Sequence, residues 1–286
     1  MQLDLFADSR DVMLRNDLIN ALQARDHAKA VVRLEALERE FPADFVLAPA
    51  RSLMGVMGRE LPTFPTHDDA LQAADRLEHE IRPDAVTLFT AQADLWLRPL
   101  WHALAHAADR LPWRADAADA HAVRFLVRGE AWADAEKRLA NIPSWRRIPR
   151  PLGWGAEIYF HQHGSAEAWP LLAELAWLDS NRFAELVRRL PATAIASLIQ
   201  QYDREFASTS DSYAWFPAWA LCVYPDLQKV LQTATTQLST PPERACQLLI
   251  QLLSLERQGR HADIVERRKE LRALNDDLFQ CYMRTR

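Results

Sequence analysis

An apolar pattern over residues 248–274, interrupted once by Gly259, constrains the fold more strongly than any other part of this sequence. Its members recur at intervals of three and four, which places them on one face of an α-helix. They are Leu248, Leu249, Leu252, Leu253 and Leu255 before the glycine and Ile264, Val265, Leu271 and Leu274 after it. Glycine adopts the positive φ angle at which one helix ends and the chain turns back. We therefore predict two antiparallel helices joined at Gly259.

The composition extends this prediction to the whole chain. Only seven of the 286 residues are glycine and 49% are hydrophobic, which is enough for a large core. Ala, Leu, Arg and Glu are abundant while runs of β-branched residues are few, which argues against a substantial sheet. We predict an all-α fold of stacked antiparallel helical hairpins.

The expected helices follow from the same periodicity and from their end signals. Thr66 and Asp69 have the spacing of a capping box. Pro99 is expected to bend the helix that contains it. The helices are expected at residues 9–23, 27–40, 45–59, 68–81, 84–110, 117–127, 132–141, 153–162, 166–178, 183–189, 192–206, 213–224, 227–238, 242–257 and 261–282.

Gly259 is followed by His261, Ile264, Arg268 and Leu271, which lie two, five, nine and twelve residues further on. This spacing resembles that of a tetratricopeptide repeat. In that family a small turn residue is followed by a ring, by a small or aliphatic residue and by two apolar contacts. Arg268 departs from the pattern, because the family has an apolar contact at its position.

The same spacing recurs at three other places in the chain. These are Arg25, His27, Ala30, Leu34 and Leu37, with Pro42 at the end; Glu130, Trp132, Ala135, Leu139 and Ile142; and Asn181, Phe183, Leu186 and Leu190. The period of about 34 residues that would give uniform stacking is not kept. The resemblance implies a TPR-like α-solenoid or right-handed superhelix whose curved surface binds proteins. A non-catalytic protein–protein interaction scaffold or adaptor is therefore the expected class of function.

One segment stands out from the helical pattern by its composition. This connector, residues 145–155, separates an N-terminal helical-repeat half, residues 9–144, from a C-terminal helical-repeat half, residues 156–286. A short N-terminal peptide, residues 1–8, precedes the first half. In this Arg/Trp/Pro-rich connector, Arg146, Arg147 and Arg150 could make stacking and phosphate contacts. We favour a connector whose tryptophans fill gaps between helices, because three charges are few for a phosphate-binding surface.

The N-terminal peptide contains the run Gln2-Leu3-Asp4-Leu5-Phe6. This run resembles the peptide by which many bacterial replication and repair proteins bind the DNA sliding clamp. The resemblance implies that Leu5 and Phe6 fill an apolar pocket of the clamp and that the Gln2 amide fixes the register. It makes the sliding clamp the candidate protein partner and these five residues the candidate protein-binding site.

A structural role is the alternative for the same peptide. Leu3, Leu5 and Phe6 would then fold back on Met13 and Leu14 and close the open end of the helical stack, as in a hydrophobic staple. Both interpretations stay open at this point.

A catalytic alternative comes from His102 and His106, which lie one helical turn apart on a common face. Such a pair can chelate a metal ion, with Asp109 as a third ligand, in a metal-dependent hydrolase. The zinc-protease pattern, however, has a glutamate directly after the first histidine, where this chain has Ala103. We therefore place this alternative behind the scaffold and expect no cofactor.

Charge, cysteine spacing and hydropathy narrow the class of protein further. A net charge of −5 gives no reason to expect direct nucleic-acid binding. The cysteines Cys222, Cys246 and Cys281 are far apart, so we expect buried thiols and neither a disulfide framework nor a zinc site. The N-terminus lacks the basic segment of a signal peptide, and no apolar run approaches the roughly 20 residues that span a bilayer. We expect a cytoplasmic protein that does not enter the membrane.

Overall fold

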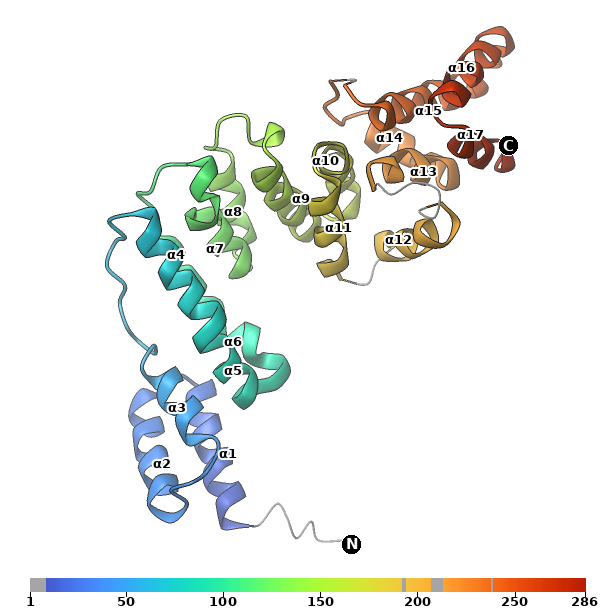
Figure 1. Ribbon diagram of the computed structural model, residues 1–286. Coiled ribbons are helices and arrows are strands. Elements are labelled where there is room, and N and C mark those ends of the chain that lie inside the picture. Colours follow the sequence, from blue (N-terminus) through green and yellow to red (C-terminus); the bar gives the residue numbers. More distant parts are fainter. Residues whose placement is uncertain (1–8, 192–193, 207–212, 238) are drawn as a thin grey trace, which may run out of the picture. The chain divides into compact units, whose positions relative to one another are not determined.

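The computed structural model describes residues 9–191, 194–206, 213–237 and 239–286, and every regular element in these ranges is helical (Figure 1). The prediction of an all-α fold is confirmed; the arrangement of the hairpins as a solenoid stays a prediction. The chain divides into two compact units, residues 1–131 and residues 132–286. None of the helices in the described ranges combines the length and the apolar character needed to cross a bilayer.

The first unit contains seven α-helices, with a π-helix between the fourth and the fifth, in the part of the chain that the structure describes. Their bounds are α1 Arg10–Gln23, α2 His27–Glu40, α3 Leu47–Met54, α4 His67–Arg76, the π-helix η1 Leu77–Ile81, α5 Arg82–Phe89, α6 Ala93–Ala107 and α7 Ala122–Arg128. Helices α1 and α2 pair, α3 packs on both, and α5 packs on α6. The expected capping box of Thr66 and Asp69 is present at the start of α4.

The second unit is built around a cluster of buried aromatic rings. Its helices are α8 Trp132–Leu139, α9 Pro149–His163, α10 Ser165–Leu178, α11 Ser180–Arg189, α12 Ala194–Glu205, α13 Phe216–Val223, α14 Gln228–Leu231, α15 Pro241–Gln258, α16 His261–Leu274 and α17 Asp276–Arg284. Tyr202, Phe216 and Trp219 are almost fully buried, and their ring centroids lie 5.3–6.1 Å apart. All three described cysteines are buried and free, as expected.

Three helix ends share one turn geometry. They lie at three of the four positions where the spacing of the repeat-like pattern begins. Arg25, Glu130 and Gly259 have φ angles of 53°, 55° and 69°. In each turn the next residue donates its N–H to the carbonyl five residues back, over 3.0, 2.9 and 3.1 Å. This is the Schellman motif, which satisfies carbonyls that the helix end leaves open. The fourth marked position, Asn181, differs, because it lies inside α11, which is capped by Asp179.

The apolar positions that follow these three turns are buried. They are Ala30, Leu34 and Leu37; Ala135, Leu139 and Ile142; and Ile264 and Leu271. At the position that departs from the pattern, the Arg268 guanidinium lies 5.4 Å from the centre of the Tyr282 ring and 3.4 Å from the Glu256 carboxylate. A cation–π contact and an ion pair thus stand where the repeat family has an apolar contact.

The turn at Arg25 is also tied to α6. Its guanidinium stacks on the Trp96 ring, 4.3 Å from the centroid, and donates a hydrogen bond to the Trp96 carbonyl. The Trp96 indole N–H in turn donates to the carbonyl of Leu22, 2.8 Å away. Two contacts therefore hold a non-glycine residue in the left-handed region.

Several expected helix limits differ from the observed ones. The expected helix 261–282 breaks at Asn275, whose side chain accepts a hydrogen bond from the backbone N–H of Leu278 over 2.8 Å and so caps α17. The expected connector 145–155 contains the start of α9, because Pro149 suits a first helical turn, where no N–H is needed. The division of the chain into compact units falls after Ala131, and the division into two helical-repeat halves at residues 145–155 stays a prediction.

We predict that Gly259→Ala lowers the free energy of unfolding by about 1–2 kcal/mol, because a Cβ disfavours the left-handed region. No atom lies within 4 Å of the added Cβ, so the loss reflects the backbone alone. Gly153→Ala in α9 is the control: its Cβ would meet only side chains at 3.4 Å or more. Urea denaturation followed by circular dichroism should show no loss for the control. Equal stability of the two variants would contradict the assigned turn.

Candidate functional site

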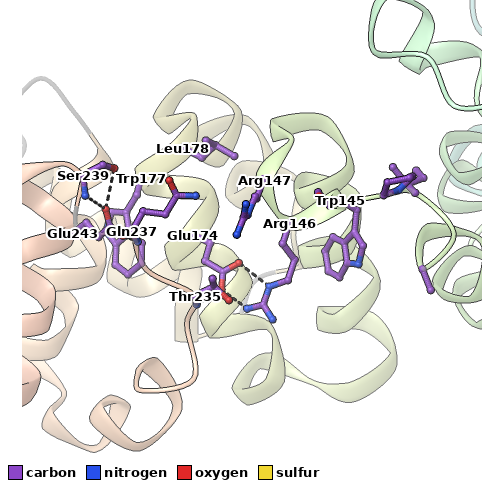
Figure 2. Close-up of a pocket in the computed structure, with 14 residues that line it drawn as sticks. Trp145, Arg146, Arg147, Glu174, Trp177, Leu178, Thr235, Gln237, Ser239 and Glu243 are labelled. Atoms are coloured by element: carbon purple, nitrogen blue, oxygen red, sulfur yellow. Dashed lines mark hydrogen bonds and ion pairs between the residues drawn. The ribbon is translucent and has the colours of Figure 1, made fainter.

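A cavity of about 500 Å³ in the second unit is the candidate functional site (Figure 2). Its wall comes from three parts of the chain: residues 140–147 after α8, the C-terminal half of α10, and the loop that joins α14 to α15. The cavity is lined by two carboxylates, by several loop residues and by three side chains of the expected connector, Trp145, Arg146 and Arg147. Parts of the chain that are distant in sequence thus meet here.

The carboxylate of Glu174 is the central charged group of this wall. Only 6% of this residue is exposed, and it lies on α10 among apolar neighbours. It accepts hydrogen bonds from Arg146 Nε over 2.9 Å and from the backbone N–H of Thr235 over 2.6 Å, and the pairing with the Arg146 guanidinium is two-pronged. The hydrogen bond to this carboxylate raises the pKa of Arg146. Such partners are what a buried carboxylate requires.

Glu243 holds the loop in a similar way. This residue, on the first turn of α15, is 4% exposed. Its carboxylate accepts from the backbone N–H of Ser239 over 2.8 Å, from the Ser239 hydroxyl over 3.2 Å and from the backbone N–H of Gln237. Helix α14 ends at Leu231, so the expected helix 227–238 is wrong over residues 232–237: the N–H groups of Thr235 and Gln237 bind glutamate side chains.

The tryptophans of the wall fill space, as the preferred interpretation of the connector predicts. The Trp145 ring packs so closely on Gly155 that a Cβ there would overlap it. Trp177 lines the cavity, and among the described residues its buried indole N–H has no hydrogen-bond partner. Arg147, next to the paired Arg146, is exposed and forms no ion pair within the described part of the chain.

Donors of the protein itself hold both carboxylates of the wall. Glu174 and Glu243 accept hydrogen bonds from side-chain and backbone groups, as buried carboxylates require. Among the described lining residues, the Arg147 guanidinium and the Trp177 indole N–H have unused hydrogen-bonding capacity, and both groups only donate. A ligand for this cavity should therefore offer acceptors, such as a carboxylate or peptide carbonyls.

Gln2, Leu3, Asp4, Leu5 and Phe6 lie outside the described residues, so both interpretations of the peptide stay predictions.

The two histidines of the hydrolase alternative lie on α6, in the first unit. Nε2 of His102 is 2.8 Å from the carbonyl oxygen of Gly129, so one of its ring nitrogens already has a partner. Within the described ranges, no group of three or more His, Cys, Asp or Glu side chains could hold a metal ion. The structure therefore adds no observation in favour of a metal site at His102 and His106.

Sequence reasoning missed Glu174, Glu243 and the loop that they hold. One signal was present: Glu174 is the only charged residue in the run 168–178, and a lone carboxylate on an apolar helix needs a buried partner. Its partner Arg146 lies 28 residues away, and no local pattern connects the two.

We predict that Arg146→Met lowers the free energy of unfolding by about 2 kcal/mol, because it leaves a buried carboxylate without its charged donor. The neighbouring Arg147→Met is the matched control and should change stability by less than about 0.5 kcal/mol, as at other surface sites. Urea denaturation measures both. Adding Glu174→Gln to Arg146→Met should recover part of the loss, because the amide oxygen still accepts from Thr235. Equal effects of the two arginine variants would contradict the assigned pair.

Comparisons of the chain with protein-family models, with curated proteins and with solved structures give no match. Function is therefore inferred from the cavity, the hairpin turns and the sequence motifs.

Proposed function

We propose that this protein is a non-catalytic helical-repeat scaffold that binds other proteins. The turns at Arg25 and Gly259 share one geometry, and each joins two packed helices, which supports repeated hairpins of the tetratricopeptide type. In repeat proteins of this kind each hairpin buries its apolar face on its neighbours and leaves a surface for peptides or proteins.

The observation that carries the proposal is the state of the two carboxylates in the cavity. Glu174 and Glu243 accept hydrogen bonds from the chain's own donors, while Arg147 lines the same cavity as an exposed donor together with two tryptophans. Arginine and tryptophan are enriched among the residues that dominate protein–protein binding. A wall of this kind favours a bound peptide segment over a reacting substrate.

The proposal has a finer part, which concerns the N-terminus. Gln2-Leu3-Asp4-Leu5-Phe6 recruits the bacterial DNA sliding clamp, and the helical units hold a second protein. The support for this part is the complete match of the pentapeptide to the clamp-binding pattern. Burial of Leu5 and Phe6 in a clamp pocket would contribute about 1.5–3 kcal/mol for each side chain.

We predict that the full chain binds an immobilised bacterial sliding clamp and that Leu5→Ala/Phe6→Ala weakens this binding at least tenfold. Tenfold corresponds to about 1.4 kcal/mol, less than the burial of either side chain. The control is Val32→Ala/Val265→Ala, which shortens two apolar side chains that are 60% and 53% exposed. Surface plasmon resonance should show that this control binds like the parent.

A synthetic peptide of residues 1–8 should also compete with the full chain for the clamp, and a scrambled peptide should not. If the parent and the Leu5→Ala/Phe6→Ala variant bind equally, or if the peptide does not compete, clamp recruitment through these residues is wrong. A lower melting temperature of that variant, without any clamp binding by the parent, would favour the structural role of the peptide.

A further inference from the structure

A second cavity lies in the first unit, bordered by the segment between α3 and α4, the C-terminal half of α4, the π-helix η1 and helix α6. Its volume is about 140 Å³. The large apolar side chains that line it are Val56, Leu61, Leu77, Ile81, Leu100 and Leu104. We call it the apolar groove. It shares no residue with the cavity at Glu174.

The π-helix that lines the groove lies directly before the first turn of α5, which contains Pro83. Proline has no N–H, so it cannot donate to the carbonyl four residues before it. The N–H of Arg82 bonds to the carbonyl of Leu77, five residues back. The widened turn carries both Leu77 and Ile81, which line the groove. Short π-helical segments of this kind occur frequently at functional sites.

The size of the groove matches a single side chain. An engineered apolar cavity of about 150 Å³ stays dry and binds benzene. At about 140 Å³, the groove has room for one leucine or phenylalanine side chain. Val56, Leu61 and Leu100 are only half-buried, so the apolar lining is accessible from solvent. Burying one such side chain would contribute about 1.5–3 kcal/mol.

The charged residues of the groove have one sign. Arg59 and Arg76 line it, and none of the lining residues in the described ranges carries a carboxylate. Arg76 lies 3.3 Å from Glu80 in a pair whose side chains are 56% and 68% exposed, and such pairs are weak. Arg59 is exposed and has no ion pair with any residue that the structure describes. This rim attracts acidic residues on either side of an apolar anchor.

We propose that the apolar groove binds an acidic segment of a partner protein by taking up one leucine or phenylalanine side chain. This inference rests on the proposed scaffold function and names the chemistry of one partner. The anchor contacts Leu77, Ile81 and Leu104, and the flanking carboxylates face Arg59 and Arg76.

The test uses fluorescence polarisation with the full chain and three short labelled peptides. The first has one leucine flanked by Asp and Glu, the second has serine in place of the leucine, and the third has lysine in place of the acidic residues. The parent chain should bind the first at least tenfold more tightly than the others. The second removes the anchor, and the third reverses the charge.

Two variants of the groove should each weaken binding of the first peptide at least tenfold. Ala103→Met fills the cavity, and Arg59→Glu reverses an exposed charge at the rim without touching the core. The matched controls are Ala28→Met and Arg110→Glu, which alter exposed residues outside the groove and should bind like the parent. Circular dichroism confirms that each variant is folded.

The inference is overturned if the three peptides bind equally or if both groove variants bind like the parent. Self-association of the chain that Arg59→Glu abolishes would assign the groove to a second copy and would also overturn it. Clamp binding depends on Leu5 and Phe6, so the two proposals fail separately. Loss of clamp binding with intact groove binding refutes clamp recruitment alone, and the reverse refutes the groove alone.

Discussion

The burial of short apolar stripes between neighbouring helices is the constraint on which this structure depends. Helices shorter than about 12–15 residues are marginal in water when isolated. Helices α1, α2 and α16 have 14 residues each, and most others are shorter. Each needs a neighbour close in the chain, and a tight reversal supplies one. The Schellman turns at Arg25 and Gly259 provide this reversal. The residues five and twelve positions after each turn are buried.

Hydrogen bonds to buried carboxylates determine the path of the chain between α14 and α15, where it is not helical. Glu174 and Glu243 must each be hydrogen-bonded, because an unpaired carboxylate in the core is too costly. Between α14 and α15 the backbone therefore supplies N–H groups to these side chains rather than to a helix. These hydrogen bonds fix the described part of the wall to the helices, as a site that is pre-organised for binding requires.

Local signals in the sequence were enough for the fold class and for several helix ends. Contacts within a few residues decide the turn at Gly259, the capping box at Thr66 and the helix 27–40. The candidate cavity and the apolar groove could not be predicted in this way. The first needs Arg146 to meet Glu174 across 28 residues, and the second needs the segment after α3, η1 and α6 to come together. Such contacts are decided by tertiary packing, which periodicity does not record.

The contact between Arg25 and Trp96 limits how modular the chain can be. The hairpin of α1 and α2 keeps its reversal in a strained backbone conformation with the help of a ring from α6. A fragment that ends after α2 would lose that ring and keep the strain. The first hairpin is thus a dependent segment of its unit, and insertions, swaps or truncations that separate it from α6 would remove the support of its own turn.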